Sequence, residues 1–278
     1  MSERTPLYEA ENAPRYDRQQ LIRRYQEDYQ CRLVVLKGPL FPDSVTPFEE
    51  TLFDADPGED LHVMLSTPGG DGETAIRLVR QAQSRCNKLT VIVPDRAKSA
   101  GTLFVLGADQ IYMGPTSDLG PVDPQIPLRD GTWAPAKAIV AAVGDAEDRI
   151  RNNPATYPLH AALLSDITGV LVQLARDALG RTDDQLREAL AVPGRDPDEV
   201  DELAQALQDP LIGETKSHDA TVSARDAESY GLPVREADPR SEQWRGIWRL
   251  WTRYAVLNVA QIYEGVRASY VVPHATPG

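Results

Sequence analysis

Residues 61–85 read LHVMLSTPGGDGETAIRLVRQAQSR and contain an apolar run, a glycine-rich turn and a helix-like pattern in that order. In the helix-like part, apolar residues recur at helical spacing, namely at Ala75, Ile76, Val79 and Ala82. An apolar run that leads through glycines into an amphipathic helix is typical of a strand followed by the helix that covers it. The stretch therefore predicts a strand and the helix that follows it, the first two elements of a βαβ unit.

Further strand candidates lie on both sides of this stretch. They are CRLVVLKG at 31–38, KLTVIVPD at 88–95 and QIYMGP at 110–115. SAGTLFVLGAD at 99–109 is apolar and rich in small residues, as a buried helix is. This alternation predicts right-handed βαβ units and a mainly parallel sheet over residues 31 to about 125. We therefore predict an α/β fold.

Helical patterns dominate the rest of the chain. Apolar residues at three- and four-residue spacing predict several helices between about residues 134 and 210. We expect a core domain over residues 31–238 with this helical insertion inside it. Residues 1–30 are expected to form a polar N-terminal segment that leads into a short surface helix. Residues 239–278 are expected to form a C-terminal helix and tail.

Composition limits the classes of function. The 278 residues are 41% hydrophobic and 26% charged, which is enough to bury a sizeable core. With 29 basic and 42 acidic residues the net charge is −13, so nucleic acid is not expected as a partner. Two cysteines, Cys31 and Cys86, are too few for a disulfide framework or a thiolate zinc site, and we expect no metal and no cofactor. We also expect no signal peptide and no transmembrane segment, hence a cytoplasmic protein.

The loop Ser66–Gly72, STPGGDG, is the first candidate for chemistry. Glycines adopt positive φ without steric cost, so backbone N–H groups in such a loop can point into a cavity. At the start of a helix these donors can hold a negative charge. The spacing matches neither a phosphate-binding P-loop nor the dinucleotide fingerprint. Taken alone, the loop is better explained as a tight strand-to-helix turn.

Ser99 is the second candidate for chemistry, and it comes directly after the third strand candidate. A serine at the first turn of a buried helix lies at the positive end of the helix dipole. The N–H of Ala100 could then stabilise an oxyanion formed by attack on a carbonyl. An N-cap serine is the commoner use of this position. Because position 97 is Ala97, the segment is not the G-x-S-x-G nucleophile elbow.

A nucleophilic serine needs a base, and the chain has four histidines. His62 lies in a strand, where a structural role is expected. His160 lies in the helical insertion and His274 in the C-terminal tail. His218, in KSHDATV, stands where the chain returns from the insertion to a strand-like segment. It is the best candidate of the four.

Four segments together make a resemblance specific. STPGGDGETA, AKSAGTLFVLGADQIYMGP, SDLGPVDPQ and SHDATVSARDAESYGLPV follow one another in the chain. In this order they resemble the serine dehydrogenase proteinase family of the ClpP/crotonase superfamily, which is related to signal peptide peptidase A. The resemblance covers roughly residues 30–125 and 213–236. It implies a ClpP/crotonase-like parallel-sheet core of βαβ units with a helical insertion and a C-terminal helix. The insertion and both termini match only weakly.

The resemblance implies Ser99 as the nucleophile of a serine peptidase. The amides of Gly69, Gly70 and Ala100 would form the oxyanion hole.

In the Clp proteolytic subunit a histidine follows the serine and an aspartate comes much later. Here the earlier place offers Asp118 and Asp123 but no histidine, and the later place carries His218. The resemblance therefore implies the chain order Ser, Asp, His, with Asp123 orienting His218 and Asp219 competing for that role. A triad is defined by geometry and not by chain order.

A serine–lysine arrangement, as in signal peptide peptidase A, is the alternative. Lys137 follows the core in APAKA, and Lys98 adjoins the serine. A lysine base must be neutral, which requires burial. A non-hydrolytic crotonase-type acyl-CoA enzyme, or a silent assembly subunit, is the competing class of function.

The expected partners are a peptide or unfolded-protein substrate and further copies of the chain. Trp244, Trp248 and Trp251 recur at helical spacing in the C-terminal segment, a large apolar stripe in a chain with few aromatics. Relatives of the fold close into rings. We therefore expect a homo-oligomer, a trimer or a multiple of one, with contacts from the C-terminal helix.

Overall fold

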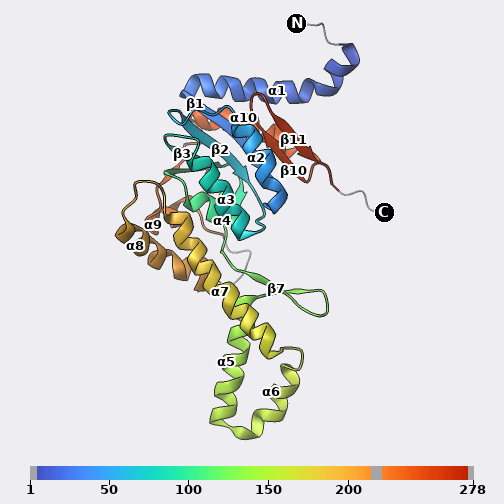
Figure 1. The fold of residues 1–278 in the computed structure, drawn as a ribbon, viewed down its shortest axis with the longest axis vertical. Helices are drawn as coiled ribbons and strands as arrows, with labels where there is room; N and C mark the ends of the chain where they lie inside the picture. The colour runs from blue at the N-terminus through green and yellow to red at the C-terminus, as the bar shows by residue number, and fades with distance from the viewer. Residues whose placement is uncertain (1–4, 214–220, 275–278) are drawn as a thin grey trace.

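The computed structural model describes residues 5–213 and 221–274 and places a seven-stranded, mostly parallel sheet at the centre (Figure 1). The strand order is β11-β10-β1-β2-β3-β5-β9. The parallel strands are β1 (Cys31–Lys37), β2 (Asp60–Ser66), β3 (Leu89–Val93), β5 (Gln110–Met113) and β9 (Val234–Glu236). The α/β fold with a parallel sheet is therefore confirmed.

The central strands are buried on both faces, so their sequences are continuous apolar runs. In β1, Leu33 and Val35 face one core, whereas Val34 and Leu36 face the other. This is the pattern expected of parallel strands covered by helices on both sides.

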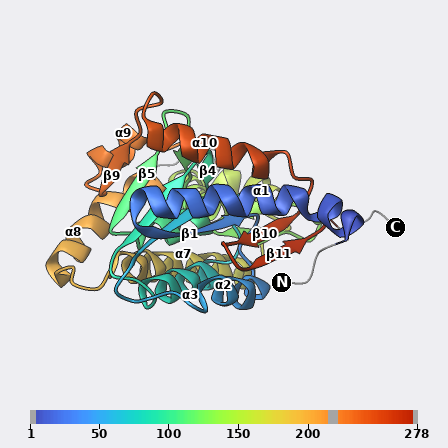
Figure 2. The ribbon, with the colours of Figure 1, turned by 90° about the horizontal axis from the view of Figure 1, so that it is seen from above.

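Helices form a layer on each face of the sheet (Figure 2). One face is covered by α2 (Val45–Leu52), α3 (Gly72–Gln83), α4 (Ala100–Leu106) and part of α7 (Gly169–Leu190). The other is covered by α1 (Pro6–Tyr29) and α10 (Glu242–Ala255). A further short helix, α9 (Ala224–Ser229), precedes β9.

The predicted helical insertion is present and in part projects from the body. It contains α5 (Ala136–Asn152), α6 (Tyr157–Leu163), α7 and α8 (Pro197–Gln208). A hairpin of β7 (Gln125–Pro127) and β8 (Trp133–Pro135) precedes α5. We call α5, α6 and the first half of α7 the arm (Figure 1).

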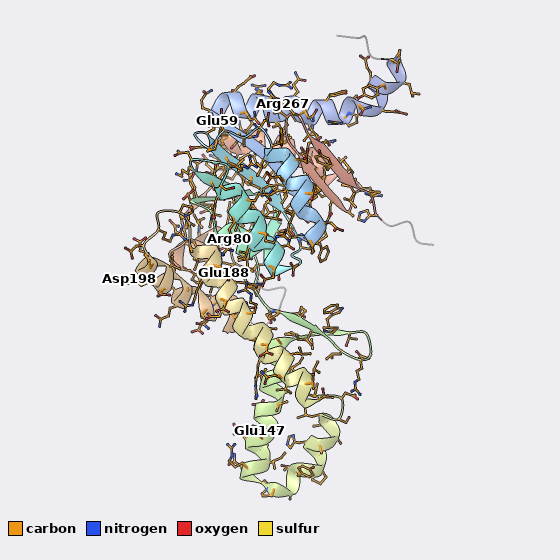
Figure 3. All side chains as sticks on the ribbon, viewed as in Figure 1. Glu59, Arg80, Glu147, Glu188, Asp198 and Arg267 are labelled. Atoms are coloured by element: carbon orange, nitrogen blue, oxygen red, sulfur yellow. The ribbon has the colours of Figure 1, made fainter. Side chains whose placement is uncertain are left out.

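Helix α7 joins the arm to the body. Its Arg181 makes two hydrogen bonds to Glu73 on α3, of 2.5 and 2.8 Å. Arg80 on α3 donates to Glu188 on α7 at 3.0 Å, and the two labelled side chains lie against each other in Figure 3. Two turns of α7 are thus attached to α3.

The two ends of the chain differ from expectation. The N-terminal helix is 24 residues long, where a short surface helix was predicted, and it buries Ile22 and Tyr25 against the sheet. The C-terminal helix ends at Ala255, and the chain then forms β10 (Gln261–Glu264) and β11 (Ser269–Val272). The predicted C-terminal helix is therefore present, but two strands follow it where a tail was expected.

The physical reason for the C-terminal difference lies in neighbouring side chains. Ile262 and Tyr263 point to opposite faces of the sheet and enter different cores, which only a strand permits. Strand β10 pairs antiparallel with β1 and covers what would otherwise be an exposed edge.

A buried ion pair fastens both ends of the chain together. Arg18 of α1 donates to both carboxylate oxygens of Glu264 on β10, at 2.6 and 3.1 Å. Tyr254 of α10 donates to the same carboxylate at 2.7 Å. A buried charge of this kind is tolerated because every partner is satisfied.

The tryptophan stripe of α10 packs largely within the subunit. Trp244 and Trp251 are buried, and Trp244 stacks edge-on against Tyr112 with ring centroids 5.7 Å apart. Trp248 is 45% exposed. Most of the surface that suggested contacts between copies is therefore internal, and the homo-oligomer stays a prediction. Within residues 5–213 and 221–274, no helix combines the length and apolarity that crossing a membrane requires.

We predict that His62 makes stability fall as the pH falls. Its Nδ1 lies 2.9 Å from the hydroxyl of Tyr25, and burial lowers its pKa from 6.5 to about 4. Between these values the unfolded chain binds a proton that the folded chain does not, so the free energy of unfolding decreases as the pH drops from about 6.5 towards 4. The loss should approach about 3 kcal/mol.

Urea denaturation at pH 7 and pH 4.5 tests this, with His62→Gln as the comparison. Carboxylates titrate in both proteins, so the difference between them isolates the histidine. An equal loss in both proteins would contradict the prediction.

Candidate active site

Two loops meet at the carboxyl ends of β2 and β3. The N–H of Thr67 donates to the carbonyl of Arg96 at 3.0 Å, and the N–H of Lys98 donates back to the Thr67 carbonyl at 3.1 Å. Adjacent parallel strands bring the loops at their carboxyl ends together. The glycine loop and the Ser99 loop, 30 residues apart in sequence, are therefore joined through their backbones.

Ser99 has an unusual backbone conformation at the start of α4. Its φ is 50° and its ψ −116°, which for a non-glycine residue costs on the order of 1–3 kcal/mol. Its side chain makes no capping hydrogen bond to the helix. The N-cap role considered for this serine is therefore not what its hydroxyl does.

The two glycines are required by close approach. Gly69 has φ 116°, and a Cβ there would lie 2.9 Å from Ser99 Cβ. Gly70 has φ 146°, and its Cβ would lie 2.1 Å from the carbonyl oxygen of Leu40. The Leu40 backbone bonds this loop on both sides, since its N–H donates to Gly69 and its carbonyl accepts from Asp71.

Asp71 also ends the loop. Its carboxylate accepts from the N–H of Thr74 at 2.8 Å and from the Thr74 hydroxyl at 2.6 Å. This N-cap explains why α3 begins at Gly72.

The three predicted oxyanion donors are not equivalent. The N–H of Gly69 donates to Thr67 Oγ1 at 3.0 Å, so it is engaged within the loop. The N–H groups of Gly70 and Ala100 donate to no acceptor in the described part of the chain. Of the three, only those two N–H groups are available to an acceptor outside the described chain.

The segment after β5 lies against the start of α4. Thr102 Oγ1 donates to the carbonyl of Gly120 at 2.8 Å. β4 (Arg96–Ala97) pairs with β6 (Asp118–Leu119). Lys98 donates to the Asp118 carboxylate at 2.5 Å and to the Leu119 carbonyl at 3.2 Å. The lysine beside Ser99 is thus engaged by this segment.

Asp123 lies three residues beyond Gly120 and is 2% exposed. Three residues span at most about 10 Å, so Asp123 is tied to the neighbourhood of α4. Lys137 Nζ, in the first turn of α5, lies 3.7 Å from Asp123 Oδ2. The N–H of Ala136 donates to the Pro124 carbonyl at 2.8 Å and fixes this approach. The structure therefore brings Asp123 and Lys137 together.

His218 and Asp219 lie outside the described residues. Val222, four positions after His218, makes a two-bond antiparallel bridge with Leu119, at 2.9 and 3.0 Å. The chain thus returns to the segment that carries Asp123. Of the other histidines, His160 lies on α6 and His274 follows β11.

Two supporting residues were missed from the sequence. Thr67 lies inside the quoted motif, but nothing in the sequence indicates that its hydroxyl bonds to Gly69. Leu40 acts through its backbone, which leaves no signal in the sequence. No cluster of His, Cys, Asp and Glu able to hold a metal ion occurs within residues 5–213 and 221–274.

We predict that Gly70→Ala destabilises the protein far more than Gly131→Ala. Both positions have positive φ, but a Cβ at Gly131 meets nothing within 4 Å, whereas one at Gly70 collides with backbone. Backbone strain alone costs about 1–2 kcal/mol. We expect that loss for Gly131→Ala and at least twice as much for Gly70→Ala in chemical denaturation. Equal losses would show that the loop moves away from Leu40 without cost.

Comparison with known proteins finds a matching family and several similar chains. Residues 55–245 match the ClpP-like SDH-type serine proteinases. Two uncharacterised proteins of Methanocaldococcus jannaschii are similar. One is 28% identical over 181 residues (65% of this chain, 53% of the relative), the other 29% identical over 175 residues (63% and 53%). The chain thus spans about half the length of these relatives.

Two solved structures are also similar in part. Both are variants of a membrane-bound stomatin-specific protease, one of them in complex with a substrate peptide. The complex has a TM-score of 0.46 and 18% identity, with 74% of each chain covered. The other has a TM-score of 0.47 and 16% identity, covering 78% of this chain and 81% of that one.

Proposed function

The chain belongs to the ClpP-like SDH-type serine proteinase family, and we propose from this that it is a serine peptidase with Ser99 as its nucleophile. Ser99 Oγ attacks a peptide carbonyl while its proton passes to a base. The tetrahedral intermediate then expels the amine, which takes up that proton, and leaves an acyl-enzyme. Water attacks the ester, releases the acid and restores the serine.

The observation that carries this proposal is the conformation of Ser99. Ser99 is held at φ 50° and its hydroxyl does not cap the helix. This strained conformation is explained if it presents the hydroxyl to a substrate. The Gly70 and Ala100 amides supply two donors for the developing oxyanion. Gly69 contributes by its lack of a side chain, because a Cβ there would strike Ser99.

For the base we propose His218, oriented by Asp123. Its support is the chain order of the motifs, the burial of Asp123 and the Leu119–Val222 bridge beside it. Neutral imidazole accepts the serine's proton and the carboxylate holds the ring in position.

Lys137 is the second candidate, favoured by its 3.7 Å approach to Asp123. A Ser–Lys mechanism requires Lys137 as the neutral amine, because only that form has a lone pair to accept the serine's proton.

We propose a peptide or an unfolded protein as the substrate and a homo-oligomer as the working form. The crotonase-type alternative would use the same amides to hold an enolate. A fluorophosphonate probe distinguishes the two, because only an activated serine reacts with it.

Ser99→Ala should abolish both peptide hydrolysis and labelling by the probe, while the free energy of unfolding changes little. A small side chain replaces a small one, and loss of a triad member removes several orders of magnitude of rate. Ser84→Ala is the matched control, since Ser84 is exposed and bonds only to its own helix turn. Hydrolysis by Ser99→Ala at the wild-type rate would overturn the proposal.

His218→Ala should reduce hydrolysis almost as far as Ser99→Ala, with Lys137→Ala milder. The wild-type rate should also fall as the pH drops through the pKa of the histidine, because only the neutral ring accepts a proton. Rates of the three variants over pH 5–9 test this. The reverse ranking would establish a Ser–Lys dyad and leave the peptidase assignment standing.

A further inference from the structure

Lys98 directly precedes the candidate nucleophile, and its side chain extends to β6. Its Nζ donates to the Asp118 carboxylate at 2.5 Å and to the Leu119 carbonyl at 3.2 Å. The side chains of Lys98 and Asp118 are 16% and 21% exposed. An ion pair shielded to this degree is screened less than a pair on an open surface, and removing one partner leaves the other charge uncompensated.

The residue after Leu119 is held as well. A Cβ at Gly120 would collide with Lys98 Cδ, so the aliphatic part of the lysine packs directly on this glycine. Thr102 contacts the same residue from the other side of Ser99, because its Oγ1 accepts from the Gly120 N–H at 3.2 Å. Residues 118, 119 and 120 are therefore each held by a side chain that flanks Ser99.

The backbone of Lys98 is fixed on both sides. Its N–H donates to the Thr67 carbonyl at 3.1 Å, which ties it to the glycine loop. Its carbonyl accepts from the N–H of Gly101 at 2.7 Å, which ties it to the first turn of α4. This one residue thus connects the glycine loop, the helix that begins after Ser99 and β6.

The contact at Leu119 also reaches the segments proposed to assist Ser99. The Leu119 carbonyl accepts from the N–H of Val222 at 3.0 Å in addition to Lys98 Nζ. Asp123 lies four positions after Leu119, and His218 lies four positions before Val222. Lys98 therefore bonds to the place where both of these segments meet.

We propose that Lys98 is a positioning residue, which acts through its ion pair with Asp118 to hold Ser99 in place relative to these two segments. β4 and β6 pair over only two residues each, so their backbone bonds alone give a weak connection. A strained residue such as Ser99 keeps its conformation only where its surroundings hold it. The inference rests on the proposed function, because it concerns how the nucleophile is presented.

The rate of labelling by a fluorophosphonate probe tests this role, since it reports on Ser99 without depending on which peptide is cut. Measured at several probe concentrations, labelling gives a maximal rate and a half-saturating concentration. Lys98→Met keeps the aliphatic stem and loses the ion pair. It should lower the maximal rate about 10- to 100-fold, as small displacements of a reacting group do. The half-saturating concentration should change by less than about twofold, because the lysine holds the serine and not the probe.

Asp118→Ala should slow labelling in the same way. Because both residues act through one ion pair, the double variant should be no slower than Lys98→Met. Arg32→Met is the matched control, since the Arg32 side chain is 17% exposed and paired with Asp54. Arg32 lies near the amino end of β1, whereas Ser99 follows the carboxyl end of β3. This control should lose stability and keep the wild-type labelling rate.

Four results would overturn the inference. Two of them are wild-type labelling of Lys98→Met and equal slowing of the Arg32→Met control. The third is a Lys98→Met variant as unreactive as Ser99→Ala beside an Asp118→Ala variant at the wild-type rate, which would make Lys98 the base. The fourth is a wild type that the probe does not label, and only this result overturns the proposed function too. Circular dichroism checks that each variant folds, and Asp118→Ala decides the test if Lys98→Met does not.

Discussion

The geometry of the candidate site depends on how closely the backbone of the glycine loop approaches Leu40 on one side and Ser99 on the other. A Cβ on Gly69 would strike Ser99, and one on Gly70 would strike the Leu40 carbonyl. The loops that carry Leu40, the two glycines and Ser99 can therefore come together only because Gly69 and Gly70 have no side chain. The strain at Ser99 persists because its neighbours on both sides are fixed by backbone hydrogen bonds and by the buried helix α4.

The sequence predicted the sheet and its covering helices well because those signals are local. Continuous apolar runs identify strands buried on both faces, and the helical period at Ala75–Ala82 identifies α3. The last strands could not be predicted in this way. From the sequence alone, Ile262 and Tyr263 fit a helix as well as a strand. They form a strand because β10 pairs with the edge of β1, and this pairing is a tertiary contact.

The site was predictable in part for a similar reason. Ser99 and the glycines lie in short motifs next to strands, so their meeting follows from parallel topology. The residues expected to assist Ser99 lie in segments between the core strands, and no local sequence pattern predicts the path of these segments. Asp123 faces Lys137 because α5 begins at Ala136, bonded to Pro124, and this contact depends on how the hairpin of β7 and β8 folds. The hydrogen bond from the Gly69 N–H to the Thr67 hydroxyl, which makes this amide unavailable as an oxyanion donor, is likewise evident only from the structure.

Helix α7 connects the two features that the sequence treated separately. Val172 and Ala175 belong to the small core of the arm, whereas Leu186 and Ala189 belong to the main core. Between them Arg181 holds Glu73, in the first turn of the helix that follows the glycine loop. Helix α7 is therefore one continuous element that packs in the arm with its first half and in the main core, beside the helix that follows the glycine loop, with its second half.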